Sequence, residues 1–430
     1  QYIYLELHNS YEVDLIKEVF INLVHHHDGL RMNYDNRNRR LLYNDSHLEH
    51  SISFQYIELN KEQRAEAFNY KDYINRWNDL FDIEKSLLFH LDVFQLDDSS
   101  QSLLFTAHHL VVDGISWRIM LEDFFFLLHH SKQELSQKTC SYQMWAEKVK
   151  EYAEENKIKG IDYWEDTLSK GKKINKIKKI DWKYTDLQDL IIQELDGSFV
   201  DELQRVVKSI YAIDLKETMI IGLALAVKNQ IGMNEMLFEL EGHGREELTE
   251  EVDISRTVGW FTTMYPVYLE LGSGEQEENI KSLKEQILTI PNNGFDYGVH
   301  KYLNLSLKDM ELETVRFNFL GDFDGIIEME KQKIANFEFG LTSDPYNKMT
   351  AIIDMTAIII NKKLKFTLAW RNDCFSKAQM NSFMNDFVQN IQFIYEVCCN
   401  KAHREFTPSD FNGADISQED LDILLNETRN

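Results

Sequence analysis

Residues 108–114 read HHLVVDG and directly follow the apolar run LLFTA of residues 103–107. This pattern predicts a buried strand that ends in two histidines and turns sharply at Asp113-Gly114. Adjacent strand residues point to opposite faces, so at most one histidine can face a shared site. A lone pair of histidines is more often structural, but the aspartate and glycine at this spacing favour a function. We interpret His109 as a candidate general base, with His108 and Asp113 as its support.

Bulk composition limits what the chain can do. With 430 residues, the chain is long for a single core and predicts two lobes. The net charge of −26 disfavours binding to nucleic acid or to anionic lipid surfaces. The four cysteines lack metal-ligand spacing and fit a reducing cytoplasm. The opening residues 1–7 look like an internal strand without a signal peptide, so we expect a piece of a longer chain. The longest apolar stretch, Met219–Val227, is too short to span a bilayer.

Strand and helix patterns alternate along the chain and predict a compact α/β body. Apolar runs predict strands at residues 2–7, 41–43, 52–57, 87–93, 103–109, 189–195, 236–241, 264–269, 315–320, 351–361 and 363–370. Helical periodicity covers residues 12–26, 116–128, 142–154, 160–169, 199–210, 216–228 and 377–398. The lysine-rich run from Lys170 to Lys183 indicates a solvated linker between the lobes, or alternatively a docking patch for an acidic partner. We therefore predict an N-terminal lobe at 1–170, a linker at 171–183, a C-terminal lobe at 184–406 and an exit linker at 407–430.

The second half carries four further segments of interest. EGHGRE at 241–246 follows an apolar strand, so Glu241 could face a cavity, although a glutamate before a glycine is usually a solvated turn residue. DISRTVGWFTTMYPV at 253–267 could line a channel or be ordinary aromatic core. PNNGFDYG at 291–298 could form a pocket rim or only a surface loop. Asn318 lies in the apolar strand VRFNFLG, where a buried amide needs polar partners.

Together these segments resemble the epimerization domains of nonribosomal peptide synthetases, which belong to the condensation-domain superfamily. HHLVVDG matches the HHxxxDG motif that the whole superfamily shares. EGHGRE, DISRTVGWFTTMYPV, PNNGFDYGVHKYL and VRFNFLGDFD look like the epimerization-specific motifs in their usual order. HHDGLR at 26–31 is similar to a structural element of the superfamily, and TPSDF at 407–411 to its exit linker. Two features depart from the pattern: the first motif is missing, and Phe319 stands where the family usually has tyrosine.

The resemblance implies two chloramphenicol-acetyltransferase-like α/β lobes, arranged as a V-shaped pseudo-dimer with a central tunnel. It implies inversion of the L α-carbon of an aminoacyl or peptidyl thioester to a D/L mixture during antibiotic biosynthesis. The substrate would arrive on the phosphopantetheine arm of a carrier-protein domain, beside neighbouring synthetase domains, with no cofactor or metal bound to this chain. The residues that the resemblance assigns are His109 and Glu241 as catalytic groups; His108, Asp113, Gly114 and Asn318 as supporting groups; and Trp117, Trp260, Phe261, Tyr297 and Phe319 as channel residues.

The implied chemistry suits these residue types. A thioester acidifies its α-hydrogen, and inversion requires that a proton leave one face and return to the other. His109 and Glu241 could serve the two faces, while the backbone N–H near Gly114, or Asn318, could stabilise the enolate oxygen. Two alternatives remain open from the sequence: a condensation domain that forms a peptide bond with the same HHxxxDG motif, and a catalytically silent docking domain.

Overall fold

The chain folds into two compact units. The computed structural model describes residues 1–48, 53–59, 81–95, 101–130, 133–174, 190–249, 251–308, 312, 314–329, 334–340, 350–411, 416–418, 420, 421, 423 and 424. Unit 1 comprises Gln1–Glu155, His243–Thr262 and Gly321–Asn347, and unit 2 comprises Asn156–Gly242, Thr263–Leu320 and Lys348–Asn430.

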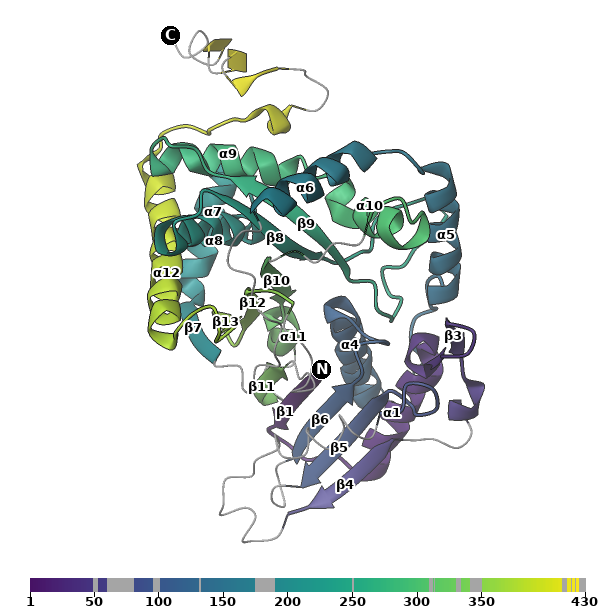
Figure 1. Cartoon of the computed structure of the whole chain (residues 1–430). Coiled ribbons are helices and arrows are strands. Elements are labelled where there is room, and N and C mark those ends of the chain that lie inside the picture. Colours follow the sequence, from purple (N-terminus) through teal and green to yellow (C-terminus); the bar gives the residue numbers. More distant parts are fainter. Residues whose placement is uncertain are drawn as a thin grey trace. The chain divides into compact units, whose positions relative to one another are not determined.

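Unit 1 is built on a five-stranded sheet of order β11-β1-β6-β5-β4 (Figure 1). Its strands are β1 (Tyr2–Leu7), β4 (Phe54–Glu58), β5 (Phe89–Gln95), β6 (Gln101–Ala107) and β11 (Ile334–Gly340), and a separate hairpin joins β2 (Met32–Asp35) to β3 (Arg40–Tyr43). Its helices are α1 (Val13–His26), α4 (Gly114–His129), α5 (Tyr142–Glu155) and α11 (Asp324–Met329), with 3₁₀ turns at Asp28–Arg31 and Asp45–Leu48.

Aromatic packing attaches α1 and α4 to this sheet. The Phe20 ring of α1 stacks on Phe89 of β5 with ring centroids 5.0 Å apart, and Phe124 of α4 meets Phe105 of β6 edge-on at 5.1 Å. Such pairs contribute about 0.5–1.5 kcal/mol beyond the burial of apolar area. Trp117 near the start of α4 also meets Phe89 at 6.1 Å, so the helix that follows the HHLVVDG segment contacts the sheet at two points along its length.

Unit 2 contains a six-stranded sheet of order β7-β13-β12-β10-β8-β9. Its strands are β7 (Leu190–Asp196), β8 (Glu235–Gly242), β9 (Thr263–Glu270), β10 (Val315–Asp322), β12 (Ile353–Ile360) and β13 (Lys363–Trp370). Its helices are α6 (Ile161–Ile174), α7 (Gly197–Tyr211), α8 (Leu215–Ile231), α9 (Gln276–Leu288), α10 (Phe295–Gly298) and α12 (Lys377–Asn400), with further helical turns at Pro291–Gly294, Val299–Leu303 and Pro408–Asp410.

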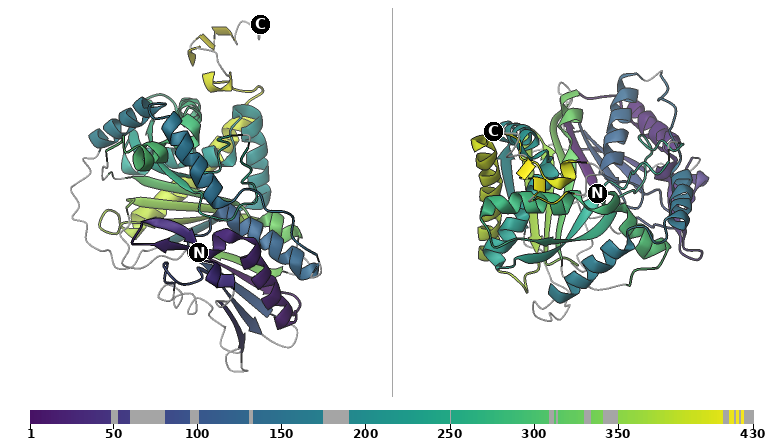
Figure 2. Two further views of the ribbon diagram at one scale, coloured as in Figure 1. Left: turned by 90° about the vertical axis from the view of Figure 1, so that its right-hand side faces the viewer. Right: turned by 90° about the horizontal axis from the view of Figure 1, so that it is seen from above.

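Helix α12 lies against α7 and α8 beside this sheet, as the views in Figures 1 and 2 show. The apolar face expected from its sequence is buried, with Phe383, Phe387, Ile391 and Ile394 inaccessible to solvent. The tight turn expected between the last two strands is also present. Asn361 and Lys362 both adopt positive φ angles, 54° and 57°, as a two-residue hairpin of matching twist requires.

The observed units differ from the lobe boundaries that the sequence suggested. Residues 334–340 pair antiparallel with β1 and so complete the sheet of unit 1 from the second half of the chain. Residues 171–174 extend helix α6 rather than belonging to a linker, and residues 175–183 lie outside the described part of the chain.

The start of the expected exit linker packs on unit 2. Thr407 is fully buried, Asp410 pairs with the buried ammonium of Lys284 on α9 at 2.5 Å, and the Ser409 amide donates to Glu285. Residues 407–410 are thus anchored to α9, so an exit linker would begin beyond them.

The mixed α/β fold agrees with the class expected from the sequence. Among the helices that the structure describes, none combines the length and apolar character needed to cross a bilayer.

Candidate functional site

The two histidines of HHLVVDG lie in a turn rather than on a strand. The sequence placed them at the end of the strand 103–109, but β6 ends at Ala107, and His109 already belongs to the turn that leads into α4. The two histidines are therefore not constrained to opposite faces of a strand. The backbone folds back so that the Val111 amide donates to the His108 carbonyl.

The tautomer of His109 is set by its backbone neighbour. Its Nδ1 lies 2.8 Å from the carbonyl oxygen of Val112. Because a carbonyl can only accept, Nδ1 must carry the hydrogen, and in the neutral ring Nε2 keeps its lone pair for a proton. Burial lowers the pKa of His109, an effect that the Val112 carbonyl partly offsets. At neutral pH the ring is therefore a neutral base with Nε2 as the reactive atom.

Trp260 is the aromatic neighbour of this imidazole. The two ring centroids are 5.2 Å apart, and the indole remains 41 % exposed. Its backbone carbonyl accepts a hydrogen bond of 2.7 Å from the Tyr142 hydroxyl, which fixes the loop that carries it. His108 plays a local role, since its Nδ1 accepts from the Leu110 amide at 3.1 Å. Trp260 is thus a partly exposed aromatic neighbour of His109.

Asp113 holds the turn, as the sequence suggested, and also a distant segment. Its buried carboxylate caps α4 by accepting from the Ser116 amide at 2.7 Å and accepts from the Phe261 amide at 3.2 Å. Both its oxygens also accept from Nη2 of Arg245 at 3.2 Å. Arg245 further donates to the Ile254 and Thr257 carbonyls, so one guanidinium ties residues 243–262 to the start of α4.

Asp113→Ala is expected to unfold unit 1 at lower denaturant concentration, because it leaves the Arg245 guanidinium buried without its anion. Removing one partner of a buried ion pair costs about 3–5 kcal/mol. Urea unfolding followed by tryptophan fluorescence measures this change, with Glu18→Ala on the exposed face of α1 as the control. A variant that unfolds like the parent but is inactive would instead assign Asp113 a direct chemical role.

Glu241 lies in unit 2 near the end of β8. Asn318 of the neighbouring parallel strand β10 donates from Nδ2 to its Oε2 at 2.5 Å, which meets the need for a partner inferred from the apolar setting of this asparagine. Burial raises the pKa of Glu241 to about 7, with Asp354 adding to the shift and Arg316 opposing it. A carboxyl group with this pKa can both accept and donate a proton near neutral pH.

The PNNG turn packs beside the end of β8. Asn292, Asn293 and Gly294 all have positive φ angles, and a Cβ at Gly294 would lie 2.1 Å from the Tyr265 ring. Only glycine fits there, because the backbone touches the aromatic face. A Cβ on Gly242, next to Glu241, would come within 3.5 Å of the Asn293 carbonyl oxygen. This turn therefore borders the backbone that presents Glu241.

Three of the five expected channel residues belong to the core instead. Trp117 is fully buried and donates from its indole nitrogen to the Gln1 side chain at 2.7 Å. Phe261 lies under the Arg245 guanidinium, 3.9 Å from its ring centroid, and Tyr297 packs against Trp164. The resemblance assigned these rings to a channel, but at these three positions the aromatic side chains fill the core. Trp260 and the half-buried Phe319 retain accessible surface.

A family model described as Condensation domain matches residues 1–417. The chain belongs to the condensation domain family. Among curated relatives, Bacitracin synthase 2 of Bacillus licheniformis is 31% identical over 431 residues, and Bacitracin synthase 1 of the same organism is 28% identical over 428 residues. Each alignment covers 97% of this chain, but only 16% of the first relative and 8% of the second, so the chain spans a small part of the length of these relatives.

Solved structures of the family share the fold of this condensation-family chain. The epimerization domain from the third module of tyrocidine synthetase B has a TM-score of 0.78 and 25% sequence identity, with 93% of both chains covered. The condensation domain of the Monacolin K polyketide synthase MokA has a TM-score of 0.68 at 13% identity, covering 94% of this chain and 92% of that one.

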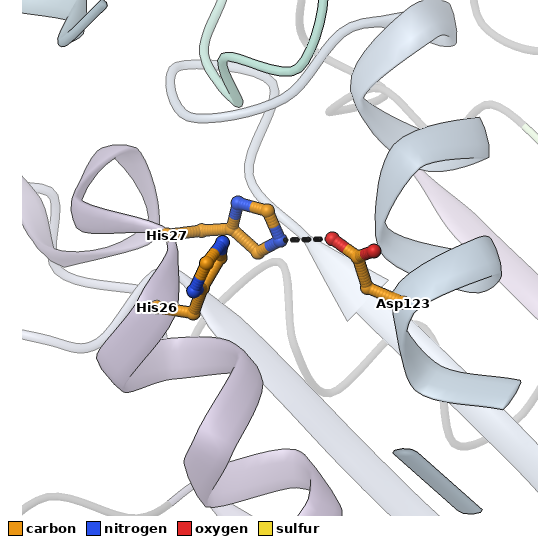
Figure 3. A group of neighbouring side chains, drawn as sticks. All are labelled: His26, His27 and Asp123. Carbon is orange, nitrogen blue, oxygen red and sulfur yellow. Dashed lines mark hydrogen bonds and ion pairs between the residues drawn. The ribbon is translucent and has the colours of Figure 1, made fainter. Parts of the chain in front are cut away.

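The HHDGLR segment, compared with a structural element from its sequence, has partners that the sequence did not reveal. His26 and His27, at the end of α1, and Asp123 of α4 lie together (Figure 3). His27 Nε2 is 2.9 Å from Asp123 Oδ2, and Arg256 pairs with Asp123 Oδ1 at 2.5 Å. His26 and His27 are of a type and spacing that could hold a metal ion, but both carboxylate oxygens are already engaged. We assign the cluster to fixing Arg256, and with it the segment 243–262, on α1 and α4.

Arg245 was also missed, although it stands within the EGHGRE motif. Its side chain is 6% exposed and makes the contacts that hold this segment on unit 1. Its burial left little signal in the sequence, because Arg245 stands between Gly244 and Glu246 and its ion-pair partner Asp113 lies more than 100 positions away.

Proposed function

We propose that this chain epimerizes the α-carbon of an L-aminoacyl or peptidyl thioester held on a carrier protein, giving a D/L mixture. The observation that carries the proposal is Glu241, a half-buried carboxyl group held by Asn318 whose pKa of about 7 suits proton transfer in both directions. It supplies a second acid/base group in addition to His109. The likeness to a tyrocidine synthetase epimerization domain supports the same function.

In the proposed reaction the two groups act on opposite faces of one carbon. One removes the α-proton, the electron pair moves into the thioester carbonyl to give an enolate, and the other group returns a proton to the opposite face. His109 Nε2 starts as the base and Glu241 as the acid in one direction, and the roles exchange in the reverse direction. Each positioned acid or base contributes about 10²–10⁴-fold.

The enolate oxygen needs donors to hold its charge. The Gly114 amide is a candidate, because it begins α4 and the N-terminal end of a helix stabilises negative charge. Asn318 is a second candidate, since its amide carries two N–H bonds and only one is directed at Glu241. Phe319 offers no hydroxyl, so any role that relied on a tyrosine hydroxyl at this position has no counterpart in this chain.

The substrate would be delivered by a partner rather than taken up free. We infer that a carrier-protein domain presents it on a phosphopantetheine arm, that neighbouring synthetase domains flank this chain, and that the chain binds no cofactor of its own. Support comes from the curated relatives, which are named as synthases of bacitracin and are much longer than this chain.

Peptide-bond formation is the second candidate, because the matching family model is named for condensation and HHxxxDG is common to both activities. Epimerization accounts better for a titratable Glu241, since amide formation by attack of an amine needs no proton returned to carbon. The products separate the two: a new amide bond, or a change in configuration alone.

Carrier-bound L-aminoacyl and L-dipeptidyl thioesters are expected to become D/L mixtures, whereas the free amino acids stay L. A free carboxylate acidifies the α-hydrogen far less than a thioester, and remote contacts to the carrier position the reacting carbon. Hydrolysis of the thioester followed by chiral chromatography measures the ratio, with an acceptor thioester added in parallel to detect any amide. Inversion of the free amino acid at a comparable rate, or a new amide without inversion, would refute the proposal.

A further inference from the structure

A row of charged side chains crosses the sheet of unit 2 next to Glu241. Glu239 and Glu241 are two residues apart on β8 and therefore project from the same face. On β10 Arg316 pairs in register with Glu239, and Asn318, two residues further along, bonds to Glu241. Asp354 of β12 lies on the far side of Arg316. Three adjacent strands thus contribute polar groups to one continuous patch.

Arg316 is the centre of this patch. Its Nε donates to Glu239 Oε1 at 2.6 Å, its Nη1 donates to Asp354 Oδ2 at 3.2 Å, and its Nη2 donates to Thr350 Oγ1 at 2.5 Å. The side chains of Arg316, Glu239 and Asp354 are 19%, 25% and 26% exposed. A charge-assisted network this well enclosed is screened far less by salt than a surface pair.

We propose that Arg316 is a positioning residue for Glu241, which, by its charge and through Glu239 and Asp354, sets the pH at which Glu241 gives up its proton. The proposal rests on the proposed function for its consequence in catalysis. Arg316 makes no hydrogen bond to Glu241 among the contacts described, so it acts by its field and by the arrangement of the two carboxylates that it holds.

The charges around Glu241 oppose one another in sign. Besides burial, Asp354 and Glu239 raise its pKa, whereas Arg316 and Lys216 lower it. Lys216, on the first turn of α8, donates to the backbone carbonyl of Glu241 at 2.9 Å. Arg316 is thus the larger of these two cationic influences and the one bonded to both flanking carboxylates, so its loss leaves Lys216 as a weaker counter to their effect on Glu241.

Removal of the Arg316 charge should raise the titration midpoint of Glu241, while removal of the Asp354 charge should lower it. In Arg316→Met we expect an upward shift of about one pH unit, a tenfold change in the ratio of protonated to deprotonated Glu241 at a given pH. Asp354→Asn should shift the midpoint in the opposite direction, and Arg316→Lys should restore it in large part. A purely structural role for Arg316 would not produce opposite signs or this rescue.

The midpoint is read by infrared titration of the carboxyl C=O band, assigned to Glu241 by its loss in Glu241→Gln. This readout does not depend on activity, so a failure of the proposed function and a failure of this inference are distinguishable. The alkaline limb of the epimerization rate should move with the infrared midpoint. Arg205→Met, which removes an exposed positive charge on α7, is the control and should change neither. An unchanged midpoint in Arg316→Met, or shifts of the same sign in Arg316→Met and Asp354→Asn, would overturn the proposal.

Discussion

His109→Ala is expected to slow epimerization of a carrier-bound thioester by at least ~10²-fold in both directions, because it removes one of the two groups that move the α-proton. The Val112 carbonyl holds Nδ1, so Nε2 is the atom of the His109 ring that presents a basic lone pair. Initial rates of inversion from the pure L and pure D thioesters measure the loss. The equilibrium ratio of the two epimers does not depend on the enzyme, so both directions must lose kcat/KM equally.

His8→Ala is the matched control, since His8 is an exposed histidine of the same unit. It should retain the parent rate. The melting temperature of His109→Ala should stay close to that of the parent, because the ring is only half-buried. A folded His109→Ala variant of near-parental activity would remove His109 from the reaction.

Glu241→Gln is expected to slow inversion by at least ~10²-fold, as His109→Ala does, while leaving binding of the carrier protein intact. Glutamine keeps the shape and can still contact Asn318, but it has no proton to exchange near neutral pH. His109 should then still remove the α-proton from the epimer whose α-hydrogen points toward it. We therefore expect loss of the α-hydrogen to solvent from one epimer only, with no inversion of either.

The pH profile of the parent provides an independent check on the same pair. The active form carries one proton on the pair, because one group must accept while the other donates, so the rate should fall on the acid and on the alkaline side of a single optimum in both directions. Glu241 has a pKa of about 7, so the alkaline limb should reflect loss of its proton. For the Glu241→Gln variant, inversion at the parental rate would show that water or another residue serves the second face of the α-carbon.

Local patterns were sufficient to predict most helices and strands. The strand at the N-terminus, the long final helix and the hairpin at Asn361-Lys362 all follow from side-chain periodicity and turn chemistry within short windows. The pairing of β11 with β1 and the return of residues 243–262 to unit 1 could not be predicted in this way. They depend on contacts between residues more than 100 positions apart, such as Arg245 with Asp113.

The candidate site was predictable only in part, because local motifs identify its residues but not their distant neighbours. HHLVVDG and EGHGRE identify His109 and Glu241 by motif, but the tautomer of His109 and the raised pKa of Glu241 depend on neighbours that only the fold supplies. Aromatic residues near the motifs were poor indicators of a channel. Trp117 illustrates the difficulty, because an aromatic ring beside a functional turn is equally suited to the core on which that turn rests.

The central claim, inversion by two groups on opposite faces, is tested most directly by a short incubation of the L-thioester in D₂O. Mass spectrometry of the separated epimers locates the deuterium. The account predicts deuterium at the α-carbon of the newly formed D epimer and little in the remaining L epimer, because the proton leaves to one group and the deuteron arrives from the other. Deuterium shared equally between the two epimers at early times would contradict the two-group account, and the absence of deuterium from both would contradict epimerization itself.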